Sequence, residues 1–161
     1  MKGGALKYSG MLAGLLLVAL FAGRGWAHGS GHHHESAEGQ EHMQQMQQLK
    51  EQIPEEYRVM NRTPVVPDTK SINHGAQLYG RFCAVCHGSD GDGDGQAAAT
   101  MESAPANFHD LEHSATYGPG EKYWIIGNGS GATGMPGFAN ELSPQYRWDL
   151  VNYIHRLQQG Q

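Results

Sequence analysis

The stretch that decides the fold is Cys83-Ala84-Val85-Cys86-His87, just past the middle of a chain of 161 residues. Its C-x-x-C-H pattern is the attachment signature of a c-type haem. Two thiols one helical turn apart can each add to a vinyl group of the porphyrin, and the histidine that follows can bind the iron. The chain holds only two cysteines. This excludes a four-cysteine zinc site and leaves a redox dithiol or a disulfide as the alternative.

The N-terminus has the layout of a secretory signal peptide. Lys2 and Lys7 precede an apolar run over residues 11–22, and small residues stand three and one before a cut after Ala27. The run is shorter than the roughly 20 apolar residues of a membrane span. Arg24 lies between the run and the cut, so an uncleaved anchor, which would hold the protein near the membrane, stays as an alternative. Export agrees with the haem motif and predicts a periplasmic protein of bacterial origin.

Charge and composition indicate what the rest of the chain can bind and how it divides into parts. It has 16 acidic and 11 basic residues, and a chain without a basic excess is not expected to bind nucleic acid. Residues 28–70 are polar and rich in His, Gln, Glu and Pro, which predicts an extension ahead of a packed domain over residues 71–161. The signal peptide would occupy residues 1–27. Within the extension, apolar side chains at helical spacing predict a short amphipathic helix over residues 40–53. These side chains are Met43, Met46, Leu49 and Ile53.

A histidine tract begins the extension. Its members are His28, His32, His33 and His34. A cut after Ala27 would make His28 the first residue, so its amine and imidazole together could chelate one copper or nickel ion, and the other histidines could add ligands. The alternative is a solvated leader without a specific metal.

From Ser71 onward the pattern is that of a packed all-α domain. Ser71 is expected to cap a helix that carries Gly75 and Tyr79 and runs into the haem motif. A short helix is expected over residues 119–127.

The last helix has the clearest sequence signals. Ser143 is expected as its N-cap, Pro144 stands at the first helical position, and apolar side chains recur at i, i+3, i+4 and i+7. These side chains are Leu150, Tyr153, Ile154 and Leu157. Such a stripe has to be buried, so the last helix must pack against another element.

Residues from about 71 to 158 resemble a class I cytochrome c, the small all-α fold of three to five helices around one covalent haem. The resemblance rests on five motifs in the family's order. They are Gly75 with Tyr79, C-A-V-C-H-G with the glycine–aspartate loop after it, Pro105-Ala106-Asn107-Phe108, Gly134-Met135-Pro136-Gly137-Phe138, and residues 147–154 (R-W-D-L-V-N-Y-I). Similar domains occur in periplasmic electron carriers and in haem-c subunits of oxidases and dehydrogenases. The resemblance implies that the first and last helices of the domain cross at the glycine.

We expect a methionine as the second axial ligand of the iron. Only two methionines follow the haem motif, Met101 and Met135, and a thioether ligand raises the reduction potential, as suits an electron carrier. Met135 lies in the glycine–proline segment where the family carries its ligand, and Met101, His109, His113 or an open iron position stay as alternatives. The predicted haem-binding residues are Cys83, Cys86, His87 and Met135, of which His87 and Met135 bind the iron. The resemblance also makes the carbonyl of Pro105 the expected hydrogen-bond acceptor of the ligating histidine.

These features predict one-electron transfer by a free carrier or by a subunit of a respiratory or dehydrogenase complex, with donor and acceptor proteins as partners. The alternative function is a haem or metal sensor or handler that uses the histidine tract or an open iron site. No Ser-His-Asp or paired-carboxylate arrangement stands out in the sequence. An iron with two axial ligands has no place for a substrate, so the protein is not expected to be an enzyme in its own right.

Overall fold

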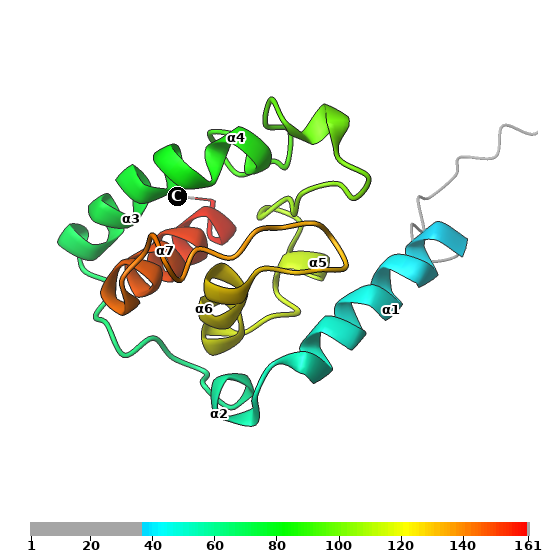
Figure 1. Ribbon diagram of the computed structural model, residues 1–161. Coiled ribbons are helices and arrows are strands. Elements are labelled where there is room, and N and C mark those ends of the chain that lie inside the picture. The colour runs from blue at the N-terminus through cyan, green and yellow to red at the C-terminus, as the bar shows by residue number, and fades with distance from the viewer. Residues whose placement is uncertain (1–36, 161) are drawn as a thin grey trace, which may run out of the picture. The chain divides into compact units, whose positions relative to one another are not determined.

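The computed structural model describes residues 37–160. Over this range the regular secondary structure consists of helices joined by loops, with no named strand. The helices are α1 (Ala37–Gln52), α2 (Glu55–Arg58), α3 (Thr69–Phe82), α4 (Ala84–His87), the 3-10 turn η1 (Ala98–Thr100), α5 (Leu111–Ser114), α6 (Pro119–Asn128) and α7 (Pro144–Gln158) (Figure 1). The all-α class, the short helix near residues 119–127 and the last helix predicted from the sequence are confirmed. In this part of the chain no helix has the length and apolarity to cross a membrane. The predicted signal peptide and His28, His32, His33 and His34 lie outside the described residues.

The fold is organised by the crossing of α3 and α7, which form the most extensive helix pair in the described range (Figure 1). At the crossing, Gly75 brings the two backbones together. A β-carbon on Gly75 would lie 2.1 Å from the carbonyl oxygen of Asp149 and 2.8 Å from the β-carbon of Tyr153. Since only glycine lacks that carbon, the predicted crossing at Gly75 is confirmed. Helix α7 also packs against α6, and α6 packs against α2.

Both crossing helices begin at a side-chain cap. The Asp68 carboxylate accepts a hydrogen bond from the backbone N–H of Ser71 at 2.8 Å, so α3 is capped by Asp68. The predicted cap at Ser71 is therefore wrong. Ser71 lies in the first turn, buried, where its hydroxyl donates to Asp149 at 2.6 Å. At α7 the prediction is confirmed, because the Ser143 hydroxyl accepts from the backbone N–H of Tyr146 at 3.3 Å.

Buried apolar side chains, mainly from α3, α6 and α7, form one hydrophobic core. Its members are Leu78, Tyr79, Phe108, Tyr123, Ile126, Leu142, Trp148, Leu150, Val151, Ile154 and Leu157. Within it, Tyr123 stacks on Trp148 with ring centres 4.2 Å apart, and the guanidinium of Arg147 lies 4.3 Å from the Tyr123 ring centre. These three side chains therefore join α6 to α7.

The polar extension contains the predicted amphipathic helix. Helix α1 spans Ala37–Gln52, and Leu49 in its last turn and Ile53 directly after it are buried. The single turn α2 follows, and Tyr57 stacks on Tyr123 of α6 with ring centres 5.8 Å apart. The boundary predicted at residue 70 therefore marks a change in composition. Side chains from before and after it still pack together.

Hydrogen bonds join α1 to the segment between α5 and α6. The Tyr117 hydroxyl donates to the carbonyl of Met46 at 2.9 Å, and the Lys50 ammonium donates to the carbonyl of Thr116 at 2.8 Å. Lys50 also lies 3.6 Å from the carboxylate of Glu121, which is buried. The C-terminal half of α1 is thus held on the domain by both apolar burial and polar contacts.

Candidate functional site

The C-x-x-C-H motif forms one tight turn directly after α3. The backbone N–H groups of Cys86 and His87 both donate to the carbonyl of Cys83, at 3.1 and 2.9 Å. This winding places the two thiols about one helical turn apart, the spacing that two thioether bonds to a porphyrin require. Both cysteines are free thiols and half-buried. Burial, and then the neighbouring Cys86, raise the pKa of Cys83 to about 12, so this thiol is protonated at neutral pH.

The imidazole of His87 is held in one orientation by two contacts. Its Nδ1–H donates to the carbonyl of Ala106 at 3.1 Å, and its ring stacks on Phe108 with centres 5.0 Å apart. Burial lowers the pKa of His87, and the hydrogen bond to Ala106 opposes this in part. With the proton on Nδ1, the lone pair of Nε2 can serve a metal ion. The acceptor expected at Pro105 is therefore one residue further along the chain.

Glycines let the loop after the motif fold back onto it. Gly88 has φ of 80°, and the Tyr79 hydroxyl donates to its carbonyl at 3.0 Å. Gly95 packs so closely that a β-carbon there would lie 2.5 Å from the carbonyl carbon of Cys86. Gly93 has φ of 79°, and a β-carbon there would stand 2.6 Å from the carbonyl oxygen of Pro105. The glycine-rich loop thereby brings the Pro105–Phe108 segment to the histidine.

Met135 lies in a turn that follows α6 and is anchored on it, because the backbone N–H of Phe138 donates to the carbonyl of Ile126 in α6 at 2.9 Å. The carbonyl of Met135 accepts from the backbone N–H of Ser130 at 2.9 Å, and the two residues form an isolated bridge. Gly129, with φ of 76°, lets the carbonyl of Met135 approach, because a β-carbon there would lie 2.4 Å from that oxygen. Phe138, three residues later, meets Phe82 at the end of α3 with ring centres 6.0 Å apart. Phe138 thus packs the methionine segment against the end of α3, directly before the haem motif.

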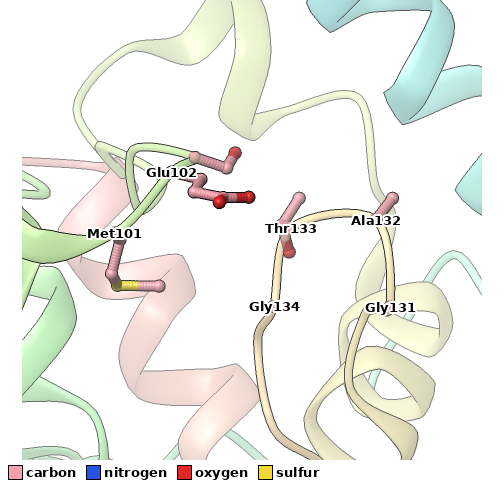
Figure 2. A pocket seen from close by; sticks show the side chains of 7 residues that line it. Met101, Glu102, Gly131, Ala132, Thr133 and Gly134 are labelled. Carbon is pink, nitrogen blue, oxygen red and sulfur yellow. The ribbon is translucent and has the colours of Figure 1, made fainter.

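A cleft of about 290 Å³ lies between residues 101–103, shortly before the Pro105–Phe108 segment, and residues 131–134, directly before Met135. Figure 2 shows Met101 and Glu102 on one wall and the turn of Gly131, Ala132, Thr133 and Gly134 on the other, with the Glu102 carboxylate pointing across the opening toward Thr133. Ser103 completes the first wall. Met101 is half-buried here, and Met135 follows directly after the opposite wall.

The two alternative histidine ligands are engaged in hydrogen bonds near their own loop. His109 Nε2–H donates to the carbonyl of Asp90 at 2.8 Å, and His113 Nδ1–H donates to the carboxylate of Asp110 at 2.6 Å. The bond from His113 lowers the pKa of Asp110. Among residues 37–160, no group of three or more His, Cys, Asp or Glu side chains is placed to hold a metal ion.

One polar cluster was not foreseen in the sequence. The buried carboxylate of Asp149 accepts from the Ser71 hydroxyl at 2.6 Å, from His74 Nδ1–H at 2.7 Å and from the Gln145 amide at 3.1 Å. Ser71, His74 and Asp149 thus meet, but the aspartate stands between the other two, so the histidine is not bonded to the serine hydroxyl. A nucleophile needs that bond to its base. The cluster therefore serves the α3–α7 crossing.

Comparison with known proteins places this geometry in a family. The family model described as cytochrome c oxidase, cbb3-type, subunit III matches residues 70–154, which is more than half of the chain. The chain is 31% identical over 91 residues to the cytochrome c subunit of alcohol dehydrogenase (quinone) from Gluconobacter oxydans, covering 52% of this chain and 18% of that protein. It is also similar, with a TM-score of 0.53 and 32% identity, to a chain of the reducing HAO-like protein complex of Kuenenia stuttgartiensis. That match covers 58% of this chain and 46% of the other.

The chain therefore spans less than half the length of these relatives, and the matched part is the domain that holds the C-x-x-C-H motif, its loop, the Met135 turn and the α3–α7 crossing. The family implies a haem c cofactor, and both it and the named cytochrome c subunit support electron transfer as the domain's function. By this match and by its fold, the chain belongs to the family of cytochrome c oxidase, cbb3-type, subunit III, a c-type cytochrome of the class I type.

Proposed function

We propose that the protein transfers single electrons in the periplasm through one covalently bound haem c whose iron is held by His87 and Met135. The observation that carries this proposal is the orientation of His87. Its Nδ1–H is committed to the carbonyl of Ala106 at 3.1 Å, directly after two free thiols on the same turn. An imidazole fixed in this way presents Nε2 as a metal ligand.

The residues present fit a haem c. Cys83 and Cys86 would form the two thioether bonds, and His87 would bind the iron on the face where Phe108 supports its ring. Met135 would be the second iron ligand, held in a turn whose Phe138 N–H donates to the carbonyl of Ile126 in α6. When bound, the haem supplies an iron that alternates between the ferric and ferrous states, and a thioether ligand favours the ferrous state relative to a nitrogen ligand.

The chain's other residues would orient the cofactor, exclude water from it and leave one edge accessible. Val85, between the two cysteines, is 54% exposed. The backbone between the two attachment points is therefore open to solvent, and a donor or acceptor could approach the haem edge there. Electrons would enter and leave there, and no substrate need reach the iron.

The compartment and the assembly belong to the same proposal. The signal-peptide pattern of residues 1–27 supports export to the periplasm. The Gluconobacter relative is named as a cytochrome c subunit and the Kuenenia chain belongs to a complex, which supports a role beside redox partner proteins. The protein would work as a freely diffusing carrier or as such a subunit in a respiratory or dehydrogenase system.

A mass and a spectrum of the purified, exported protein test this proposal. We expect an intact mass raised by one haem that acid–acetone does not extract. We also expect a low-spin spectrum in both redox states, with the sulfur-to-iron charge-transfer band in the ferric form. An extractable haem would contradict attachment by Cys83 and Cys86. A high-spin ferric spectrum would contradict the second axial ligand and favour a sensor with an open iron position.

A further inference from the structure

Two histidines from distant parts of the chain meet where α1 lies on the domain. The ring centres of His42, on α1, and His113, on α5, are 5.4 Å apart, and the ring planes are inclined by 59°. Both side chains are half-buried. Neither is among the residues proposed to hold the haem, so the pair calls for a separate explanation.

Hydrogen bonds between the two segments bring the histidines together. On α1, Met46 follows His42 by one helical turn. Tyr117 follows His113 by four residues, and its hydroxyl donates to the carbonyl of Met46 at 2.9 Å. In the next turn of α1, the Lys50 ammonium donates to a backbone carbonyl of the same segment at 2.8 Å. The approach of the two rings is therefore set by the packed backbone and not by two loose side chains.

A carboxylate determines the tautomer of one of the rings. His113 Nδ1–H donates to the carboxylate of Asp110 at 2.6 Å. The carboxylate is itself held in place, because it also accepts from the backbone N–H of Glu112 at 3.1 Å. With the proton on Nδ1, the lone pair of His113 lies on Nε2. A carboxylate behind a histidine is the arrangement that orients a metal-binding imidazole and raises its basicity.

The separation of the two rings suits one shared metal ion. Zinc binds histidine nitrogen at about 2.0–2.1 Å, so two imidazoles on one tetrahedral ion have ring centres roughly 5 Å apart. The observed 5.4 Å is close to that value. Among residues 37–160 no group of three His, Cys, Asp or Glu side chains is placed to hold a metal ion, so water would complete the coordination.

We propose that His42 and His113 bind one divalent transition-metal ion of the zinc class, with Asp110 as the residue that positions His113. The ion fastens the polar extension to the domain, because its two protein ligands come from α1 and α5. An ion that binds only the folded chain also stabilises it. The inference requires no haem, so it can fail while the proposed function stands.

The test uses the full-length protein, with zinc ions alone as the probe. The tract histidines would bind zinc themselves, so all of them are replaced by glutamine in every sample. These are His28, His32, His33 and His34. Titration calorimetry measures affinity and stoichiometry, and thermal unfolding measures stability with and without zinc. We expect one zinc ion per chain and an unfolding temperature that rises with the zinc concentration.

Three substitutions probe the site, and a fourth is the matched control. His42→Gln and His113→Gln should each abolish the one-to-one binding and the rise in unfolding temperature. Asp110→Asn should weaken the affinity for zinc by about 10–100-fold, because it alters only the support of a ligand. His155→Gln removes an exposed histidine of α7, hydrogen-bonded to Gln159, and should leave the binding and the rise unchanged.

The zinc-free unfolding temperature of each variant separates a purely structural effect from the loss of a ligand. A protein that takes up no zinc overturns the inference. So does unchanged affinity in either His42→Gln or His113→Gln, or an equal loss in His155→Gln. If the two ligand variants do not fold, Asp110→Asn decides, and an unchanged affinity there overturns the inference as well.

Discussion

The α-carbon of Gly75 lies against the carbonyl of Asp149, so that a β-carbon on the glycine would stand 2.1 Å from that oxygen. Such a distance is far inside any van der Waals contact, and the neighbour is backbone, which cannot rotate away. The two helices can therefore cross at this depth only while residue 75 has no side chain.

Replacing Gly75 by alanine or valine should force α3 and α7 apart and lower the free energy of unfolding by about 1–3 kcal/mol, with valine the worse. Chemical denaturation followed by circular dichroism measures this. The same helix offers a matched control at Gly80, where a β-carbon would meet nothing within 4 Å. Gly80→Ala should stabilise the protein by about 0.5–1 kcal/mol through helix propensity. Equal effects at both glycines would show that the crossing does not depend on Gly75.

Removing the buried carboxylate of Asp149 should destabilise the crossing. Asp149→Ala leaves the Ser71 hydroxyl and the Gln145 amide without their acceptor and deprives His74 of its partner. The expected loss is about 3 kcal/mol in the free energy of unfolding. Asp149→Asn keeps the shape and one acceptor oxygen, so it should lose less. If both variants unfold at the wild-type denaturant concentration, the cluster contributes nothing to stability.

Met135→Ala should abolish the sulfur-to-iron charge-transfer band of the ferric protein and lower the reduction potential, because the thioether is the ligand that favours ferrous iron. The visible spectrum and the midpoint potential report both effects. Met101→Leu is the matched control, since Met101 lines the cleft and is the other methionine that follows the haem motif. Loss of the band in Met101→Leu, with the band kept in Met135→Ala, would reverse the assignment.

A chain that begins near Glu55 should keep the spectrum and the potential of the full protein but lose stability. Burial of Leu49 and Ile53 contributes about 1.5–3 kcal/mol for each side chain, and the truncation removes both. The double variant Leu49→Ala, Ile53→Ala should reproduce most of the loss in the intact chain. An altered haem spectrum after truncation would instead mean that α1 supports the haem site itself.

The stability of the domain should depend on pH through Lys122. Burial lowers the pKa of this ammonium to about 8, while its hydrogen bond is made to the carbonyl of Tyr117. The unfolded chain, with an ordinary lysine pKa near 10.4, binds the proton more tightly than the folded chain. This group's contribution to the free energy of unfolding therefore rises between about pH 8 and 10.4. Compared with wild type, Lys122→Met should be relatively most stable near pH 7, and that difference should shrink as the pH is raised. A difference independent of pH would contradict the shift.

The sequence predicts most of the fold because its strongest signals are local. The stripe of α7, its Ser143 cap and the apolar face of α1 depend on residues within a few turns of one another. The cap of α3 could not be predicted in the same way, since Asp68 and Ser71 are both good N-caps. The choice between them involves Asp149, which is 78 residues from Ser71 and takes its hydroxyl.

In the candidate site, too, local patterns could be predicted and contacts set by the folding of a loop could not. The haem motif can be recognised in the sequence because its chemistry fixes the spacing of the two cysteines and the histidine. The carbonyl that accepts the hydrogen bond of His87 depends instead on how a loop folds. Close packing of Gly93 on the carbonyl of Pro105 turns the carbonyl of Ala106 toward the histidine. Composition likewise could not show that a mostly polar extension buries Leu49 and Ile53, nor that it forms hydrogen bonds with Thr116 and Tyr117, more than 60 positions away.

The crossing of α3 and α7 has a consequence for the order of events when the chain folds. It joins Gly75 to Asp149, so it closes a loop that contains the haem motif, the glycine loop and the Met135 turn. Contacts between such distant positions form late and slowly, because the entropy of loop closure must be overcome before they contribute. The C-x-x-C-H turn, by contrast, is held by hydrogen bonds within five residues. A nascent chain that has not yet supplied α7 can thus already present its two thiols on an open surface.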